Sequence, residues 1–399
     1  MTTAVYLNAL GLICALGNDV AQVRQALFSS QPPALPAHEA IVPGKSFPVA
    51  RVSAGLASVD ALLPQLRSRN NAILLTALAQ IRDEVDAVIA RFGPARVAIV
   101  LGTSTSGIFE SENAIRAFQQ TGKVPAQFHP SQQEMGSPAM ALQQVLGIHG
   151  PAYAISTACS SGAKALASAA RLLRMDLADA VIAGAVDSLC GFTVAGFASL
   201  DSVSASGCAP LMPERDGIHI GEGAALFLVT REHGPVRLAG VGESSDAHHI
   251  SAPAPDGSGA RAAMEQALER ANRTPADIDY INLHGTATEQ NDAMESIAVS
   301  ALFGTAASIS PTPVSSTKHS TGHTLGAAGA VEAGICWIVL HENPEGALPP
   351  NWPCRAPDPA LPPLFPVPPG FVLERAPRAV LSNSFAFGGS NAALVLERA

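Results

Sequence analysis

The chain has 399 residues, of which 47% are hydrophobic and only 14% are charged, and its net charge is -9. This length can bury a large core and fits two domains or two fused halves, and the few charges indicate that many elements are covered on both sides. The acidic balance argues against nucleic acid or an anionic membrane surface as the main partner.

The six cysteines show none of the paired spacings typical of zinc sites or of small disulfide-rich domains, which indicates reduced thiols. The N-terminal sequence lacks a basic region followed by a cleavage site, so no signal peptide is predicted. The apolar stretch 325–340 falls short of the roughly 20 residues that a membrane helix needs and contains Glu332. A cytoplasmic protein without a membrane span is therefore expected.

Strand and helix patterns alternate through the first part of the chain. Strands are predicted at 5–14, 96–101, 152–157, 178–185 and 221–229, and helices at 20–28, 72–89 and 133–146. Asp19 is placed to cap the first of these helices. Residues 30–60, which are rich in proline and glycine, are predicted to form an irregular surface excursion, and residues 200–217 a loop.

The second part of the chain repeats the same order. Strands are predicted at 236–242, 278–284, 314–316, 379–383 and 392–397, and helices at 259–271, 292–303 and 325–340. The proline-dense stretch 343–370 reads as an extended connection along the surface. The repetition predicts a pseudo-duplicated α/β architecture with one half at 1–232 and the other at 233–399.

Cys159 lies between a predicted strand and a predicted buried helix, in a run of small residues. A thiol at the N-terminus of a helix faces the positive end of the backbone dipole, which favours the thiolate and makes the cysteine a candidate nucleophile. The alternative is an inert cysteine packed in the core, because free cysteines are among the most buried residues.

Two histidines follow later strands of the same kind. His284 lies in the loop 282–288 and His323 in the loop 316–323, both rich in Gly, Ser and Thr. A third small-residue loop, 102–107, follows a buried strand; it could cradle a ligand or could be a tight connection to a helix. The pattern makes Cys159, His284 and His323 candidates for one site.

These stretches resemble the β-ketoacyl-acyl carrier protein synthases that have a Cys-His-His active site. The resemblance extends from residues 11–17 to the C-terminus. Its motifs are TACSSG at 157–162, HGTAT at 284–288, STK at 316–318 with GH at 322–323, and NSFAFGG at 383–389. The family implies a thiolase-like fold with five layers in the order αβαβα, and a condensing acyltransferase.

By this resemblance, Cys159 would take an acyl chain from a phosphopantetheine thioester on acyl carrier protein. His284 and His323 would promote the decarboxylation of malonyl-carrier and stabilise the resulting enolate. Soft thiol nucleophiles suit thioesters, and imidazole N–H groups suit a developing oxyanion. The resemblance implies no metal and no cofactor bound by the enzyme itself.

The resemblance also implies supporting roles. The backbone N–H groups of Cys159 and Phe387 would form the oxyanion hole, and the Phe387 side chain would be a gate between the acyl and malonyl sites. Lys318 and Glu295 match the family's lysine and its ordering carboxylate. For these two residues, a buried ion pair that holds the site together is an equally open reading.

Four further residues are expected to contact substrate. Thr286 and Thr288 match hydroxyls that contact the pantetheine arm, Phe385 lies in the NSFAFGG motif, and Thr105 matches the position that controls entry to the acyl pocket. A pocket lined by hydroxyls loses part of the roughly 0.8 kcal/mol that each buried methylene contributes. This favours a specialised chain, unsaturated or aryl-started as in polyenes, over housekeeping fatty acids.

The chain departs from the family pattern at three positions, with Ala386 in place of glycine, Ser390 in place of threonine and Glu289 where proline is common. Ala386 is expected to stiffen the gating loop because it lacks the conformational freedom of glycine. His248 and His319 are interpreted as bystanders.

Two other functions remain open. A thiolase would need a second cysteine in the segment 383–390, which has none. A chain-length-factor-like partner would usually have lost its nucleophile. Relatives pair through the strand beside the nucleophile helix, so a dimer with a copy or with a paralogue is expected. The acidic carrier protein would dock on basic residues; the candidates are Arg67, Arg69, Arg171 and Arg174.

Overall fold

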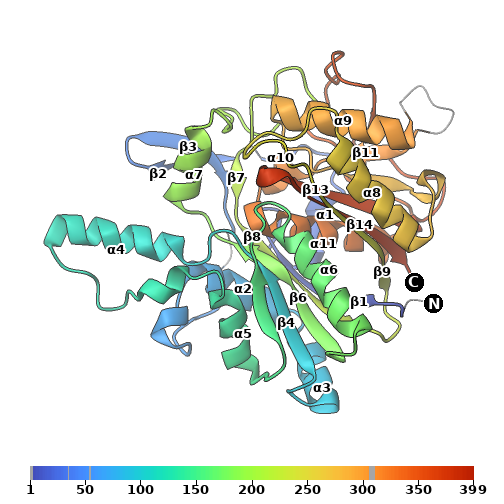
Figure 1. The fold of residues 1–399 in the computed structure, drawn as a ribbon. Helices are drawn as coiled ribbons and strands as arrows, with labels where there is room; N and C mark the ends of the chain where they lie inside the picture. Colours follow the sequence, from blue (N-terminus) through green and yellow to red (C-terminus); the bar gives the residue numbers. More distant parts are fainter. Residues whose placement is uncertain (1–2, 35, 54, 305–310) are drawn as a thin grey trace.

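The computed structural model describes residues 3–34, 36–53, 55–304 and 311–399. Its centre is a mixed sheet of eleven strands (Figure 1). The strands, in spatial order, are β12 (Phe365–Pro366), β11 (Pro313–Ser315), β10 (Tyr280–Asn282), β13 (Ala379–Ala386), β14 (Ser390–Arg398), β9 (Val236–Ser245), β1 (Tyr6–Ile13), β8 (Gly223–Thr230), β6 (Ala180–Asp187), β4 (Val97–Gly102) and β5 (Ala152–Ile155).

Helices cover both faces of this sheet in three layers. The helices are α2 (Arg69–Ala79) and α5 (Ser137–Leu146) on one outer face, α6 (Ser161–Arg174) and α11 (Ala328–Leu340) in the middle, and α8 (Ser258–Ala271) and α9 (Glu289–Phe303) on the other outer face. The middle pair packs on both halves of the sheet, so the layers follow the order αβαβα. The predicted fold class is therefore confirmed.

The strands of the first half read as continuous apolar runs because helices cover both of their faces. Every residue of β4, β6 and β8 is buried. The two middle helices approach each other closely where each carries a glycine. A Cβ on Gly162 would lie 2.5 Å from the Ala330 nitrogen, and one on Gly329 would lie 2.7 Å from the Ala163 nitrogen. Only glycine allows this approach at the helix that follows Cys159.

The single helix predicted at 72–89 is wrong. The chain forms α2 and then α3 (Arg82–Phe92), with a break at Gln80. The Gln80 side chain hydrogen-bonds both the N–H and the C=O of Leu12 and the C=O of Asn18. These contacts to a distant strand and turn fix the break, and the apolar periodicity of the sequence does not record them.

The irregular excursion predicted at 30–60 is also partly wrong. Residues there form a hairpin of β2 (Ala37–Val42) and β3 (Lys45–Ala50), which turns at Gly44 and pairs with β7 (Ile220–Gly221). The β2 strand is exposed on both sides, so it lacks the alternating apolar pattern that would have identified it.

The sequence did not predict two further helices, of which the second contributes Phe197 to the cavity described below. They are α4 (Ile108–Thr121) and α7 (Gly191–Ala198), and two carboxylate oxygens of Glu112 on α4 accept the backbone N–H groups at the start of α7. Helix α1 (Val20–Leu27) begins as predicted, with Asp19 accepting the Gln22 N–H at 2.8 Å. Over the described residues, no helix has the length and apolarity that crossing a membrane requires.

Candidate active site

Cys159 lies in the turn between β5 and α6, two residues before the helix begins. Ala158 adopts a left-handed conformation with φ of 51°, which turns the chain sharply. The Ser161 hydroxyl donates to the Ala158 carbonyl at 2.6 Å and accepts the Thr157 N–H at 2.9 Å. The small side chains after Cys159 thus hold the turn, and the thiol is buried at the N-terminal end of α6, as predicted.

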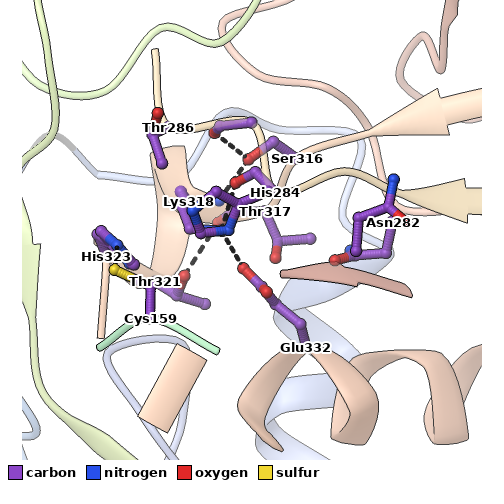
Figure 2. Close-up of polar contacts among 12 residues, drawn as sticks. Cys159, Asn282, His284, Thr286, Ser316, Thr317, Lys318, Thr321, His323 and Glu332 are labelled. Carbon is purple, nitrogen blue, oxygen red and sulfur yellow. Dashed lines mark hydrogen bonds and ion pairs between the residues drawn. The ribbon is translucent and has the colours of Figure 1, made fainter. Parts of the chain in front are cut away.

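Two imidazoles converge on this thiol from the second half of the chain. His323 Nε2 lies 3.0 Å from Cys159 Sγ (Figure 2). The His284 ring meets the His323 ring edge to face, with the centroids 5.4 Å apart. One ligand atom from each of the three residues lies within 4.8 Å of the other two. The three groups predicted to form one site are therefore together, in a cluster that could also coordinate a soft cation such as zinc.

Burial governs the protonation of these three groups. It raises the pKa of the Cys159 thiol to about 12, although Lys318 and the backbone N–H of Phe387 partly offset it. Burial, followed by the nearby Lys318 ammonium, lowers the pKa of His284 and of His323 well below 6.5. The resting cysteine is thus a thiol, contrary to the predicted thiolate, and both imidazoles are neutral.

Lys318 opens the short helix α10 (Lys318–Thr321) and is fully buried. Its Nζ donates to the His284 carbonyl and forms an ion pair with Glu332 on α11 (Figure 2). Burial raises the pKa of Glu332 to about 7, against the lowering effect of Lys318. In the sequence, Glu332 stands out only as an interruption of an apolar stretch, so its place in the site was not predicted.

Glu295 does not pair with Lys318, so the predicted alternative of a Lys318–Glu295 ion pair is wrong. The Glu295 carboxylate instead accepts the N–H groups of His284 at 2.8 Å and Gly285 at 2.7 Å. The Asn383 side chain donates to it at 3.2 Å. Glu295 lies on α9, which faces the His284 loop, whereas Glu332 lies on the central helix beneath Lys318. Glu295 therefore holds the backbone that carries His284.

A cavity of about 420 Å³ leads from the surface to the three groups. Its lining includes Thr286 and Thr288, whose hydroxyls lie 2.9 Å apart, and Phe385, whose ring lies 6.3 Å from that of His284. Glu289, which is exposed at the start of α9, also lines it. Three of the four residues expected to contact substrate thus line one cavity with Cys159.

Thr105, the fourth of these residues, is fully buried and does not line this cavity. Its Oγ1 donates to Asp187 at 2.8 Å, and Thr103 and Ser104 donate to the same carboxylate. The Ser106 hydroxyl donates to the Glu134 carbonyl at 2.8 Å. The hydroxyls of this loop are therefore all hydrogen-bonded to other groups of the protein. The premise of a hydroxyl-lined acyl pocket is wrong.

Phe387 begins a short loop, residues 387–389, between β13 and β14. Its backbone N–H is close enough to the Cys159 thiol to lower the pKa of that thiol. Its ring packs against that of Phe197 on α7, with the centroids 5.5 Å apart. Both rings line the cavity. Phe387 therefore lies where its backbone N–H could belong to an oxyanion hole beside Cys159 and where its ring could act as a gate in the cavity.

The four arginines considered for carrier docking are not free at the cavity mouth. Arg69 forms an ion pair through two nitrogens with the buried Glu222, and Arg67 donates to the carbonyls of Leu62 and Asp60. Arg171 and Arg174 lie in the last turn of α6, at the opposite end of this 14-residue helix from Cys159. A helix of that length spans about 20 Å.

The two histidines read as bystanders do not touch the reacting groups. His319 is buried, and its Nδ1 lies 2.6 Å from the Cys208 carbonyl. His248 is exposed. Asp187, which was not predicted as part of the site, binds the loop 103–105 and also accepts the N–H of Gly326, three residues after His323, at 2.6 Å. An acidic residue at the end of a buried strand was the signal that could have identified it.

Comparison with known families shows that the chain matches the two domain models of one family. Residues 71–234 match the family model described as beta-ketoacyl synthase, N-terminal domain, and residues 236–354 match that of the C-terminal domain. The chain is 32% identical to a 3-oxoacyl-[acyl-carrier-protein] synthase 2 of Coxiella burnetii, over 99% of this chain and 98% of that protein. Cys159, His284 and His323 all lie inside the matched ranges.

Two further proteins are more similar in sequence. A 3-oxoacyl-[acyl-carrier-protein] synthase 2 of Rhizobium meliloti is 40% identical over 63% of this chain, and the match spans 62% of that relative's length. A ketosynthase from Xenorhabdus doucetiae, solved in complex with its chain length factor, is 44% identical. Its fold matches with a TM-score of 0.91 over 100% of this chain and 98% of that one.

Proposed function

The chain belongs to the beta-ketoacyl synthase family, and on this basis we propose that it catalyses decarboxylative condensation. An acyl group is transferred to Cys159 and then joined to malonyl-acyl carrier protein, giving 3-oxoacyl-acyl carrier protein and carbon dioxide. The observation that carries the proposal is the 3.0 Å contact between Cys159 Sγ and His323 Nε2, with His284 beside them.

In the acyl transfer step, the Cys159 sulfur attacks the thioester carbonyl of the acyl carrier. Because burial keeps the thiol protonated, its proton must pass to a base, and the neutral His323 Nε2 is in contact with it. The backbone N–H groups of Cys159 and Phe387 receive the oxyanion. The pantetheine thiolate then leaves and takes up the proton, and the acyl group remains on Cys159.

In the condensation step, malonyl-carrier binds in the cavity with its thioester carbonyl facing the two imidazoles. Loss of carbon dioxide leaves an enolate, whose oxygen receives N–H donors from His284 and from His323, which in this step is the neutral tautomer that carries its proton on Nε2. The enolate carbon attacks the acyl carbonyl, and the Cys159 sulfur leaves as a thiolate that takes up a proton from solvent, which restores the thiol. Lys318 and Glu295 act as positioning residues, since one holds the His284 carbonyl and the other the His284 N–H. No step requires a metal.

Mass spectrometry after incubation with acyl-acyl carrier protein tests this proposal. We expect an acyl adduct on the peptide that contains Cys159, and its loss after addition of malonyl-acyl carrier protein with formation of a 3-oxoacyl carrier. Cys159→Ala is the control and should carry no adduct. A native chain that takes up no acyl group from any carrier would contradict the proposal and would favour a non-catalytic partner subunit.

We further propose that the chain works as a dimer, with a chain-length-factor-like paralogue as the favoured partner. The likeness to the Xenorhabdus doucetiae ketosynthase, which was solved with its chain length factor, supports a paralogue over a second copy. Size-exclusion chromatography of the chain alone and with a co-expressed paralogue tests this. A stable complex of two identical chains would contradict it.

A specialised acyl chain of the polyene type remains the proposed substrate, although the argument from pocket polarity no longer supports it. Efficient elongation of octanoyl and longer saturated carriers would contradict this proposal. We also propose that the chain divides into two halves, residues 1–232 and 233–399. Its substrates are carried on the phosphopantetheine of acyl carrier protein, and it works in the cytoplasm.

A further inference from the structure

Lys164 lies in the first turn of α6, five residues after Cys159, and is half-buried. Its Nζ donates to the Ser390 hydroxyl at 2.6 Å. Among the residues that the structure describes, it forms no ion pair with a carboxylate. Partial removal of an ammonium group from water costs free energy, and a hydrogen bond to a neutral hydroxyl offsets only part of that cost. The contact joins the nucleophile helix to a distant part of the chain.

Ser390 is the first residue of β14 and directly follows the loop 387–389. Its hydroxyl also lies 3.2 Å from the hydroxyl of Ser160, the residue next to Cys159, but the single Ser160 proton is shared with the Thr157 carbonyl at 2.9 Å. Lys164 is therefore the stronger of the two donors from the start of α6 that hold the C-terminal end of this loop.

The rest of the loop is held more sparsely. Gly388 is exposed, its N–H donates to the Ile250 carbonyl at 2.8 Å, and the Gly389 carbonyl accepts the Asp246 N–H at 2.9 Å. Both glycines have positive φ, 80° and 72°, a conformation that a loop can leave readily when its anchors are weakened. The position of the Phe387 N–H relative to Cys159 thus depends on the anchors at the two ends of the loop.

We propose that Lys164 is a positioning residue, which through Ser390 holds the loop 387–389 against the start of α6 and keeps the Phe387 N–H aimed at the reacting thioester oxygen. Lys164 itself touches neither substrate nor Cys159. This inference rests on the proposed condensing function, because the Phe387 N–H matters only where an oxyanion forms beside Cys159. The proposal gives Ser390, one of the departures from the family pattern, a specific partner.

The test compares two variants with acyl-acyl carrier protein as substrate. Lys164→Met keeps the aliphatic stem and removes the donor, whereas Lys164→Arg keeps a charged donor. Complete removal of an oxyanion donor costs about 10² to 10³ in rate, so loosening one should lower kcat for acyl transfer by about 10-fold in Lys164→Met. The Michaelis constant should change less than about two-fold, because carrier binding is not affected. Lys164→Arg should recover most of the rate.

Alkylation of Cys159 by iodoacetamide gives a readout that simple destabilisation would not reproduce. A loosened loop uncovers the thiol, so Lys164→Met should be alkylated faster than the native chain while it turns over more slowly. Lys123→Met is the matched control, since Lys123 is exposed beyond the end of α4. It should leave both rates unchanged. Equal alkylation rates in Lys164→Met and the native chain would contradict the proposal.

A double-mutant cycle separates action through Ser390 from other effects of Lys164. If the lysine acts through this hydroxyl, Ser390→Ala should lower kcat by a similar factor, and adding Lys164→Met to it should have little further effect. If the decrease in kcat of the double variant equals the product of the two single decreases, Lys164 acts through a group other than Ser390. A native chain without any acyl uptake would instead refute the condensing function, so the two failures can be told apart.

Discussion

Two buried polar clusters lie close to Cys159, and they use their hydrogen-bonding groups differently. In the first, Asp187 accepts six donors between 2.5 and 3.1 Å, five of them from Thr103, Ser104 and Thr105 and one from Gly326. In the second, formed by His284, His323, Lys318 and Glu332, the Nδ1 atoms of both histidines and one carboxylate oxygen of Glu332 have no hydrogen-bond partner among the residues that the structure describes.

The difference indicates that the first cluster maintains the structure of its loop and that the second supports catalysis. An unpaired buried polar atom costs about 1–3 kcal/mol, so the second cluster is held in place at the expense of stability. It keeps protons and lone pairs that can still change partners, as acid–base catalysis requires. The Asp187 cluster has used its capacity on its own loop and has none left for substrate. Substitutions should therefore affect mainly activity in the second cluster and mainly stability in the first.

The largest effect is expected at the nucleophile beside the second cluster. Cys159→Ala should lower condensation by about 10⁴-fold or more, because the covalent acyl intermediate cannot form. The free energy of unfolding should change by less than about 1.5 kcal/mol, since a buried thiol is replaced by a group of similar size. Product formation from acyl and malonyl carriers, together with urea unfolding, measures the two quantities. Residual turnover within 10-fold of the native rate would contradict the assignment of Cys159.

The first cluster should show the opposite balance. Asp187→Asn replaces a carboxylate that accepts six donors with an amide that also donates, so several donors lose their partner. We expect the free energy of unfolding to fall by about 3 kcal/mol or more. Urea unfolding measures it. An unchanged unfolding midpoint with a loss of activity alone would place Asp187 among the reacting groups and erase the distinction between the clusters.

The pH dependence of activity sharpens the comparison further. The imidazoles are already neutral at pH 6, because burial holds their pKa well below 6.5. Glu332, whose pKa is raised to about 7, gains a proton as the pH falls through 7 and then no longer offers Lys318 a charged partner. Condensation by the native chain should therefore fall below pH 7. Glu332→Gln should be slower, by about 10-fold, and independent of pH between 6 and 8.

Rate profiles of the two proteins with the same carriers check this prediction. Thermal unfolding recorded across the same pH range is the control, because a decline caused by loss of folded protein would appear there as well. If the acid limb persists in Glu332→Gln, it belongs to a histidine, and the second cluster is then charged differently from what its burial implies.

The smallest effect is expected at Thr105. Thr105→Val keeps the shape of the side chain and removes one donor to Asp187 and the acceptor of the Ser188 N–H, so stability should fall by about 1–2 kcal/mol. The rate of acyl transfer should stay within two-fold, because the hydroxyl does not face the cavity. A large change in preference between saturated and unsaturated acyl carriers would restore the hydroxyl-lined pocket that the structure contradicts.

The sequence alone determined most of the catalytic constellation. Cys159, His284 and His323 could be identified because each follows a strand, and because each lies in a short motif that resembles those of the β-ketoacyl synthases. The repeated order of strands and helices likewise predicted a pseudo-duplicated α/β architecture, to which the resemblance added the order of the layers. These features are local, or repeat along the chain, so they are readable without knowledge of contacts.

Only the tertiary structure decided which charges and hydroxyls meet. Lys318 pairs with Glu332 and not with Glu295, Thr105 turns to Asp187, and the side chain of Gln80 ends a helix that looked continuous. These partners lie on different layers of the fold, and a sequence pattern records the type of a residue but not which neighbour it faces. Protonation follows the same rule, since burial raised the pKa of Cys159 where the position of that residue at a helix terminus predicted a thiolate.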